Sequence, residues 1–168
     1  LEDWRVQVGY SWLDAKFDEY YDNALNIPER PLIDTANNRL PSWTPEHTLN
    51  VNVDARLART AWGTLRGIVD FTYQSKVYAY AVNDSLSAPD AGGAYSAAAD
   101  ELPSRSNINA RLQLSELSFG GDGVADISIW IRNLADTDEP STIIDFGNFT
   151  TATWTEPRMY GASFSYKW

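Results

Sequence analysis

The side chain best suited to acid–base chemistry at neutral pH is the only histidine, His47, which follows Glu46 in the stretch TPEHTLN. An imidazole beside a carboxylate can act as a general base or a metal ligand, but catalysis also needs a nucleophile and a group that orients it. No motif marks a nucleophile, and no Gly-rich phosphate loop, zinc spacing or dinucleotide fingerprint occurs. We therefore predict no enzyme activity, no catalytic residue, no metal site and no cofactor, with His47 at an exposed rim. A hydrolase that depends on His47 stays the open alternative.

Two long stretches are acidic and contain aromatic residues. Residues 81–103 and 135–156 carry Asp and Glu but no Lys or Arg. Such loops can attract cationic or metal-bearing ligands, or they can simply be solvated surface. Aromatic rings in connecting segments can stack on a sugar or on a chelate ring, or can pack loop against loop. The candidate substrate-binding residues are Trp43, Tyr95, Phe146 and Trp154, with Phe149 close by.

Composition narrows the class of protein. The chain has 168 residues, with 13 basic and 23 acidic side chains and a net charge of -10, so nucleic acid is not expected as a partner. It has no cysteine and therefore no disulfide framework. No apolar run reaches the roughly 18 residues of a membrane-spanning helix, and the chain does not open on a signal peptide. We expect a single domain over residues 1–168, with any export signal removed or upstream.

Apolar and polar residues alternate in six stretches, which is typical of strands that are buried on one face. We predict strands over about residues 4–14, 47–57, 64–80, 105–115, 125–134 and 158–168. The connections alternate between long and short, which is the rhythm of a meander with its long loops at one rim. The predicted fold class is all-β: an antiparallel up-and-down meander of about six long strands.

The alternation does not say what covers the apolar face. A soluble sandwich of two sheets would bury it between them. The stretches are long enough to cross a bilayer as tilted strands, and six strands with an apolar band about 25 Å tall expose roughly 700 Å². Aromatic rings flank that band: Trp4, Trp62 and Trp168 fall at the short-turn end, and Trp12, Tyr73, Tyr78 and Tyr80 toward the long-loop end. These features favour part of a transmembrane β-barrel with aromatic girdles.

The opposite rows hold the charged side chains of the predicted strands. A water-filled or protein-filled barrel interior accommodates charge, whereas lipid does not. We therefore predict a lumen wall that includes Arg66, Asp70, Arg111 and Arg132.

The final stretch, MYGASFSYKW, resembles the C-terminal assembly signal of bacterial outer-membrane proteins. The resemblance lies in Tyr160, Gly161, Phe164, Tyr166 and the terminal Trp168, while Met159 stands where that pattern favours a polar residue. It implies that the barrel-assembly machinery recognises this strand, through edge pairing with an unpaired strand.

Two longer motifs extend the resemblance to the whole chain. WIRNLADTDEP, followed by TEPRMYG, is similar to the last hairpin of TonB-dependent outer-membrane receptors, with Asn133, Leu134 and Asp136 after one strand and Pro157, Arg158, Tyr160 and Gly161 opening the next. LPSWTPEHTLNVNVDARL and SRSNINARLQL resemble earlier strands of the same family. Such receptors have a plugged 22-stranded barrel. The resemblance implies the last six strands of such a receptor, a C-terminal fragment without the plug and the energy-coupling motif.

The resemblance also implies a function and partners. The receptors import a scarce nutrient, such as a siderophore, a vitamin or an oligosaccharide, across the bacterial outer membrane. The expected partners are outer-membrane lipid and lipopolysaccharide, the rest of the barrel and its plug, the barrel-assembly machinery, and an inner-membrane energy-coupling protein reached through the N-terminal part. The alternatives are a soluble all-β carbohydrate-binding module and a short, stand-alone relative of the receptor barrel.

Overall fold

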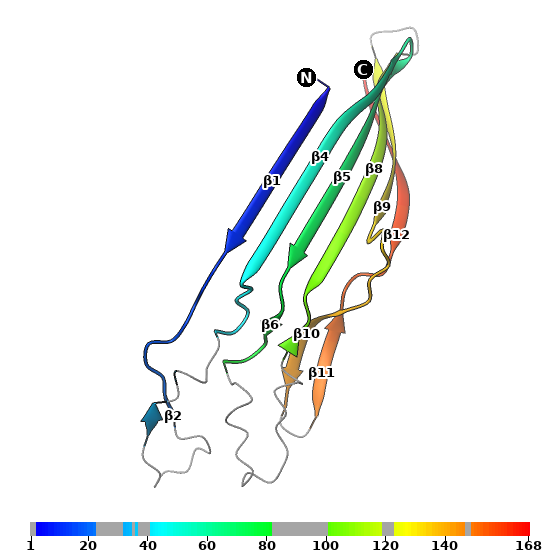
Figure 1. Ribbon diagram of the computed structural model, residues 1–168. Coiled ribbons are helices and arrows are strands. Elements are labelled where there is room, and N and C mark those ends of the chain that lie inside the picture. Colours follow the sequence, from blue (N-terminus) through cyan, green and yellow to red (C-terminus); the bar gives the residue numbers. More distant parts are fainter. Residues whose placement is uncertain are drawn as a thin grey trace.

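A long, twisted antiparallel sheet dominates the computed structural model (Figure 1). The structure describes residues 3–22, 32–34, 36, 41–81, 101–118, 123–146 and 149–168. The sheet has six strands in the order β1-β4-β5-β8-β9-β12, so each strand pairs with the next one along the chain. The strands are β1 (Trp4–Trp12), β4 (His47–Thr60), β5 (Gly63–Gln74), β8 (Arg105–Ser118), β9 (Val124–Arg132) and β12 (Met159–Lys167). The predicted all-β class and the six-stranded antiparallel meander are confirmed.

One predicted strand is two separate elements. The alternation over residues 64–80 suggested a single strand, but β5 ends at Gln74 and β6 (Val77–Tyr78) pairs with β7 (Glu101–Leu102) in a different sheet. The cause is the length of the neighbouring strand, because β4 begins at His47 and offers no ladder beyond that point. At the break, the Ser75 backbone N–H donates to the His47 carbonyl at 2.9 Å. The prediction of a continuous strand to residue 80 was therefore wrong.

Two bulges keep the side chains of the long strands on the correct faces. The register shifts between Arg56 and Ala58 in the β4–β5 ladder, and between Leu114 and Leu117 in the β8–β9 ladder. A bulge adds one residue to one strand only, and without such a correction a one-residue slip would turn every later side chain to the other face. Below the second bulge, Leu117 again lies opposite Ala125.

Residues that lie opposite one another on neighbouring strands form rows across the sheet, and each row is mainly apolar or mainly polar. One row runs from Val6 through Val53, Val69, Ala110 and Ile131 to Tyr160. The next row lies on the opposite face and runs from Arg5 through Asp54, Ile68, Arg111 and Trp130 to Gly161. The sheet therefore has one apolar face and one polar face, as period-two alternation requires.

The two ends of the sheet differ. The N- and C-termini and the tight β4–β5 connection lie at one end, which we call the short-turn end (Figure 1). At the other, long-loop end lie the small β6–β7 sheet and the hairpin of β10 (Pro140–Asp145) and β11 (Thr150–Trp154). A further small sheet joins β2 (Tyr21–Asp22) to β3 (Ile33–Asp34). The β10–β11 hairpin falls within the stretch 135–156 that the sequence analysis treated as a loop.

The buried apolar cluster of the described residues is not on the long sheet. It consists of Val77, Ala79, Leu102 and Ile143, with Tyr80 packed against it, and so joins the β6–β7 sheet to β10. Tyr78 and Tyr80 lie at the long-loop end, as predicted, but they belong to the small structures there and not to the long strand predicted over residues 64–80. Across the described ranges we find no helix with the length and apolar character of a membrane span.

Candidate functional site

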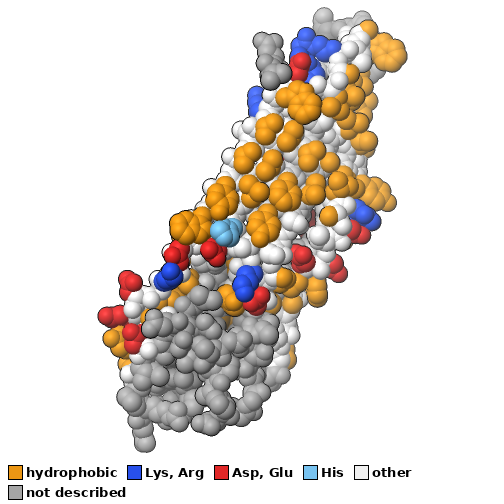
Figure 2. Space-filling view, viewed as in Figure 1, with side chains coloured by type: hydrophobic (Ala, Val, Ile, Leu, Met, Phe, Trp, Pro, Cys, Tyr) orange, Lys and Arg blue, Asp and Glu red, His pale blue; other side chains and the backbone are white. Residues whose placement is uncertain are grey.

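The apolar face of the long sheet is uncovered. Figure 2 shows apolar side chains spread over the sheet, with charged side chains gathered at its two ends. Val8 is 64% exposed, Ile129 59% and Phe164 67%, values far above those of side chains in a protein core. Between the two ends, the described strand residues of this face include no Asp, Glu, Lys or Arg. This face therefore needs an apolar covering that the described part of the chain does not supply.

Aromatic side chains mark both ends of the apolar face. Trp4, Trp62 and Trp168 lie at the short-turn end, with exposed fractions of 59%, 75% and 95%. Tyr10 and Trp12, which end β1 at the long-loop side, are 64% and 61% exposed. Tyr73 lies opposite Leu49 at the same end. Indole and phenol rings in such positions suit the boundary between an apolar and an aqueous medium.

The polar face carries paired charges on neighbouring strands. The Arg66 guanidinium makes two hydrogen bonds with the Asp54 carboxylate, Nε to Oδ1 at 3.1 Å and NH2 to Oδ2 at 2.5 Å. The Asn52 amide donates to Oδ1 of Asp70 at 2.6 Å. These are cross-strand pairs of the kind that stabilise a sheet.

A depression of about 540 Å³ lies on the polar face over strands β5, β8, β9 and β12. Three of the predicted lumen-wall residues, Asp70, Arg111 and Arg132, line it. The fourth, Arg66, does not line it and instead pairs with Asp54. The other polar or aromatic residues of its lining are Asn109, Trp130 and Ser163. The sequence alternation puts Trp130 on the same side of its strand as Arg132, but it does not mark Trp130 as part of a site.

The indole of Trp130 is held from three sides. Its Nε1–H donates to the Ser163 hydroxyl at 3.3 Å. A Cβ added at Gly161 would lie 2.5 Å from Cζ2 of the ring, so the indole packs directly on the backbone of β12. The Arg132 guanidinium carbon lies 5.4 Å from the ring centroid, within the range of a cation–π contact. The ring thereby fixes the position of one of the two arginines in the depression.

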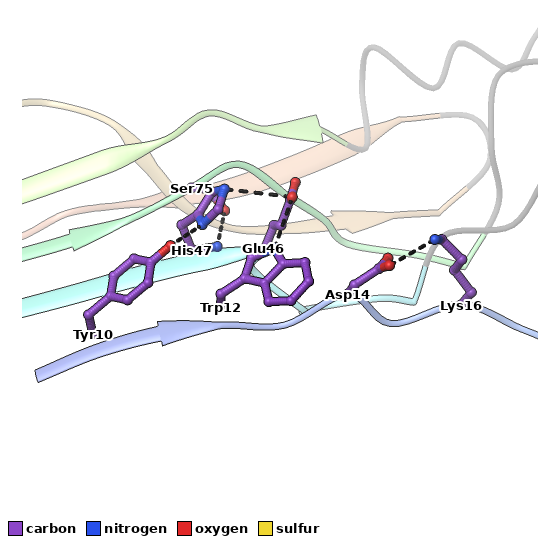
Figure 3. A network of polar contacts seen from close by, with 7 residues as sticks. All are labelled: Tyr10, Trp12, Asp14, Lys16, Glu46, His47 and Ser75. Atoms are coloured by element: carbon purple, nitrogen blue, oxygen red, sulfur yellow. Dashed lines mark hydrogen bonds and ion pairs between the residues drawn. The ribbon is translucent and has the colours of Figure 1, made fainter.

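His47 lies at the long-loop end of the apolar face, within a polar network (Figure 3). Its Nδ1 is 2.9 Å from the Tyr10 hydroxyl, and its Nε2 is 3.6 Å from Oε1 of Glu46. The same carboxylate oxygen accepts a 3.4 Å hydrogen bond from Nε1 of Trp12. The network ties the start of β4 to the end of β1.

The geometry at His47 differs from that of a Ser–His–acid triad. The Ser75 hydroxyl oxygen accepts a hydrogen bond from the backbone N–H of His47, at 3.1 Å, rather than from its imidazole. A hydrolytic arrangement needs the hydroxyl within reach of the imidazole nitrogen. The His47 network therefore links strands, and it does not bring the Ser75 hydroxyl to the imidazole.

Two lysines at the same end are paired. Nζ of Lys16 lies 2.8 Å from Asp14, and the hydrogen bond and charge of that carboxylate hold the pKa of Lys16 above its ordinary value. The pKa of Lys76 is raised above its ordinary value, mainly by a hydrogen bond with the Tyr78 side chain and to a smaller extent by one with Glu101. Both lysines line a small pocket of about 230 Å³ beside the polar network.

The candidate substrate-binding aromatics are not gathered into one site. Trp43 adopts a positive φ of 55° and its backbone N–H donates to the Tyr78 carbonyl at 2.8 Å. Phe146 stacks on Phe149 with ring centroids 4.8 Å apart beyond the end of β10, whereas Trp154 lies opposite Pro140 at the other end of that hairpin. Tyr95 lies outside the described residues. The structure therefore separates Phe146 from Trp154.

The resemblance motif around Asn133 forms a buried junction. The Asn133 side chain is 1% exposed, and its Nδ2 donates to the carbonyls of Thr137 and Glu156 at 2.9 and 3.0 Å. Its Oδ1 accepts from the Thr137 backbone N–H at 3.0 Å. Arg158 lies 3.1 Å from Asp136. Asn133, Asp136 and Arg158 thus join the chain leaving β9 to the chain entering β12, and no sequence pattern had marked Thr137 for this role.

The residues of the predicted assembly signal lie on β12, at the edge of the sheet, or directly after it. Tyr160, Phe164 and Tyr166 share the apolar face and are 83%, 67% and 47% exposed. Gly161 faces the other way, beneath Trp130. β12 pairs only with β9, so its outer ladder is open within the described residues.

Nothing in the described ranges assembles three or more His, Asp or Glu side chains in a way that could hold a metal ion. Comparisons with protein-family models, curated proteins and solved structures found no match to this chain.

Proposed function

We propose that this chain forms part of the barrel wall of a TonB-dependent outer-membrane receptor that imports a scarce nutrient across the bacterial outer membrane. The observation that carries the proposal is the uncovered apolar face, which has no charge between its ends and has aromatic rings at both ends. Lipid is the covering that this pattern fits, because rings settle at headgroup level and charge is costly in the band between them.

Strand length and the open edges support the same proposal. The long strands contain 9 to 14 residues, and a tilted strand needs about 9–11 to cross a bilayer. β1 and β12 each have one unpaired edge within the described residues. Six strands are fewer than the roughly eight needed to enclose a filled interior, so further strands would complete the wall.

In this proposal the polar face borders the lumen, and Asp70, Arg111 and Arg132 face water or the plug. The Asn133 junction fixes the entry of β12, the strand that we propose is recognised during assembly. The remaining partners are lipopolysaccharide, the plug and, through the N-terminal part, the energy-coupling protein. The proposed location is the bacterial outer membrane, and the proposed role is transport and not catalysis.

Spin labels on one strand test the membrane assignment. Val53 and Asn52 are neighbours on β4, and their side chains lie on the apolar and the polar face of the sheet respectively. The 168 residues contain no cysteine that would compete for the label. In the full-length protein reconstituted in lipid, a label at Val53→Cys should be relaxed by oxygen, which concentrates in lipid, and not by a water-soluble nickel complex. A label at Asn52→Cys should show less oxygen relaxation. If a protein sandwich covers the apolar face instead, the Val53 label will be shielded from both reagents.

Uptake tests the transport assignment separately. A strain that lacks the full-length protein should lose accumulation of one scarce nutrient, and removal of the energy-coupling protein should have the same effect. Normal growth on every limiting siderophore, vitamin and oligosaccharide source would contradict transport even if the spin labels report lipid.

A further inference from the structure

We infer that the depression on the polar face is a binding site for a small hydroxylated carboxylate. The inference rests on the proposed function only in that this face must border water. The site is the 540 Å³ depression over strands β5, β8, β9 and β12, with Arg111 and Arg132 as its cations.

The two arginines of the depression have no carboxylate partner among the described residues. Arg66, on the same face, is fully engaged with Asp54, and Arg56 is paired with Asp3. Arg111 and Arg132 make no ion pair with any carboxylate of the described residues, which is also true of Arg5 and Arg59 outside the depression, although the chain as a whole has a net charge of -10. Guanidinium groups left without a carboxylate in an acidic protein are suited to an anion from outside.

Arg132 is held by its contact with the ring of Trp130. Its guanidinium lies over the Trp130 ring, and that ring is fixed by Ser163 and by its packing on Gly161. A cation–π contact does not use the N–H donors of a guanidinium in hydrogen bonds, so these donors remain free for another acceptor. Arg132 is therefore positioned in advance to donate to a carboxylate. Arg111 lies directly opposite Trp130 on the neighbouring strand.

Asp70 and Asn109 give the depression groups that can bind the hydroxyls of a ligand. Asp70 also lines the depression, and a simple anion would be repelled by it. Its Oδ1 accepts the Asn52 amide, which leaves Oδ2 able to accept a hydrogen bond from a ligand hydroxyl. Asn109 uses Oδ1 for the Asn133 backbone N–H and keeps its amide donors. The set of donors and acceptors fits a carboxylate that carries hydroxyl groups better than it fits a bare anion.

Calorimetric titration of the full-length protein in detergent with D-gluconate tests the site. Glucitol has the same carbon chain and hydroxyls without the carboxylate, and hexanoate has the carboxylate without the hydroxyls. We expect gluconate to bind and each of the two analogues to bind at least about tenfold more weakly, because each loses one half of the contacts. Equal binding of gluconate and glucitol, or no binding of gluconate, would overturn the inference without any variant.

Matched variants locate the site. Arg111→Gln and Arg132→Gln should each weaken gluconate binding by about tenfold or more. Arg66→Gln removes the same charge from the same face, outside the depression, and should change the affinity by less than about twofold, as expected for charge lost from a separate position. An equal loss in all three variants would mean general charge attraction and would exclude a defined site.

A failure of the proposed function is distinguishable from a failure of this site. A protein that is monodisperse in plain buffer would contradict the membrane proposal. The same titrations can then be made in that buffer, and they would still test the binding site.

Discussion

At the scale of single residues, the indole of Trp130 packs directly on the backbone of β12 at Gly161. The Cβ position of Gly161 would be 2.5 Å from the ring, which is closer than side-chain atoms can approach. A glycine on an edge strand that is covered by a cross-strand aromatic ring is a known way to stabilise a sheet position that has no side chain of its own. The pairing of Gly161 with Trp130 means that any larger residue at position 161 would have to displace the ring or the strand.

Gly161→Ala should therefore lower the free energy of unfolding by about 1–3 kcal/mol, because the ring or the strand must move. Gly9→Ala is the matched control, since nothing lies within 4 Å of its Cβ position. We expect that control to change stability by less than about 0.5 kcal/mol. Denaturant unfolding in detergent measures both, and equal effects of the two substitutions would contradict the role assigned to Trp130.

The Asn133 junction makes a second prediction at this scale. Asn133→Ala should reduce the free energy of unfolding by about 2–4 kcal/mol, because it leaves the Thr137 N–H and two carbonyls without their partner in a buried site. Asn50→Ala, on the exposed part of β4, is the control and should have little effect. If Asn133→Ala unfolds at the same denaturant concentration as the wild type, the junction is not a stabilising element.

Asp34 gives a prediction for pH. Its carboxylate accepts hydrogen bonds from the backbone N–H groups of Tyr20 and Ala36, both at 3.0 Å, and these hold its pKa below the ordinary 3.8. A lowered pKa means that the folded state favours the ionised form, so the two contacts are complete above pH 3.8 and are lost as the pH falls through the lower folded value. The amide resonances of Tyr20 and Ala36 should shift together in that acidic range. In Asp34→Asn neither should do so, and a shift that persists there would assign the titration to another group.

At the scale of elements, the last strand separates its two faces residue by residue. Phe164 points to the apolar face opposite Ile127, and Ser165 points to the polar face opposite Asp126. An added lysine therefore has opposite consequences at two adjacent positions. On the lipid side its charge must be desolvated, whereas on the other side it meets a carboxylate.

Phe164→Lys should therefore block assembly of the full-length protein, while Ser165→Lys should assemble normally. A charge on the lipid face costs up to about 2–4 kcal/mol and less near the membrane boundary, and it also removes an aromatic residue of the proposed assembly signal. Deletion of Trp168 should have the same effect through that signal. The readout is the amount of protease-resistant protein in the outer-membrane fraction, and normal amounts of Phe164→Lys would refute both the signal and the lipid-facing assignment.

At the scale of the whole molecule, the buried apolar cluster is small and lies away from the long sheet. Val77, Leu102 and Ile143 are buried at the long-loop end, whereas side chains such as Val8 and Ile129 on the long sheet are more than half exposed. Among the described residues of the long sheet, the buried hydrophobic side chains are Ala55, Leu117 and Ala125. The stability of the sheet must therefore depend largely on what covers its apolar face.

The full-length protein should accordingly be monodisperse in detergent and should aggregate when the detergent is removed. An apolar face of roughly 700 Å² is larger than the patch of a few hundred Å² that soluble monomers usually expose. Static light scattering before and after detergent removal measures this. A monodisperse monomer in plain buffer would favour the soluble all-β module over the barrel wall.

Much of this architecture could be predicted from local sequence, and some of it could not. Alternation identified all six long strands and their faces, because side-chain direction in a strand depends only on position along the chain. The break after Gln74 was not predicted, since the alternation continues past it to Val77, the apolar run VYAY follows, and only the start of β4 ends the ladder. The β10–β11 hairpin was missed although the β-branched residues Thr142, Ile143 and Ile144 stand shortly before a Gly-Asn pair in the sequence, a combination typical of a hairpin.

The sequence by itself determined which side chains share a face, because the two-residue period of a strand is a local property. It also determined the absence of charge along the apolar rows. Only the tertiary structure decided which residues meet across strands: that Arg66 is paired while Arg111 and Arg132 are not, that Trp130 rests on Gly161, and that Asn133 reaches Glu156. Those contacts depend on register and on bulges, and register is set by the pairing of distant segments, which no single strand contains.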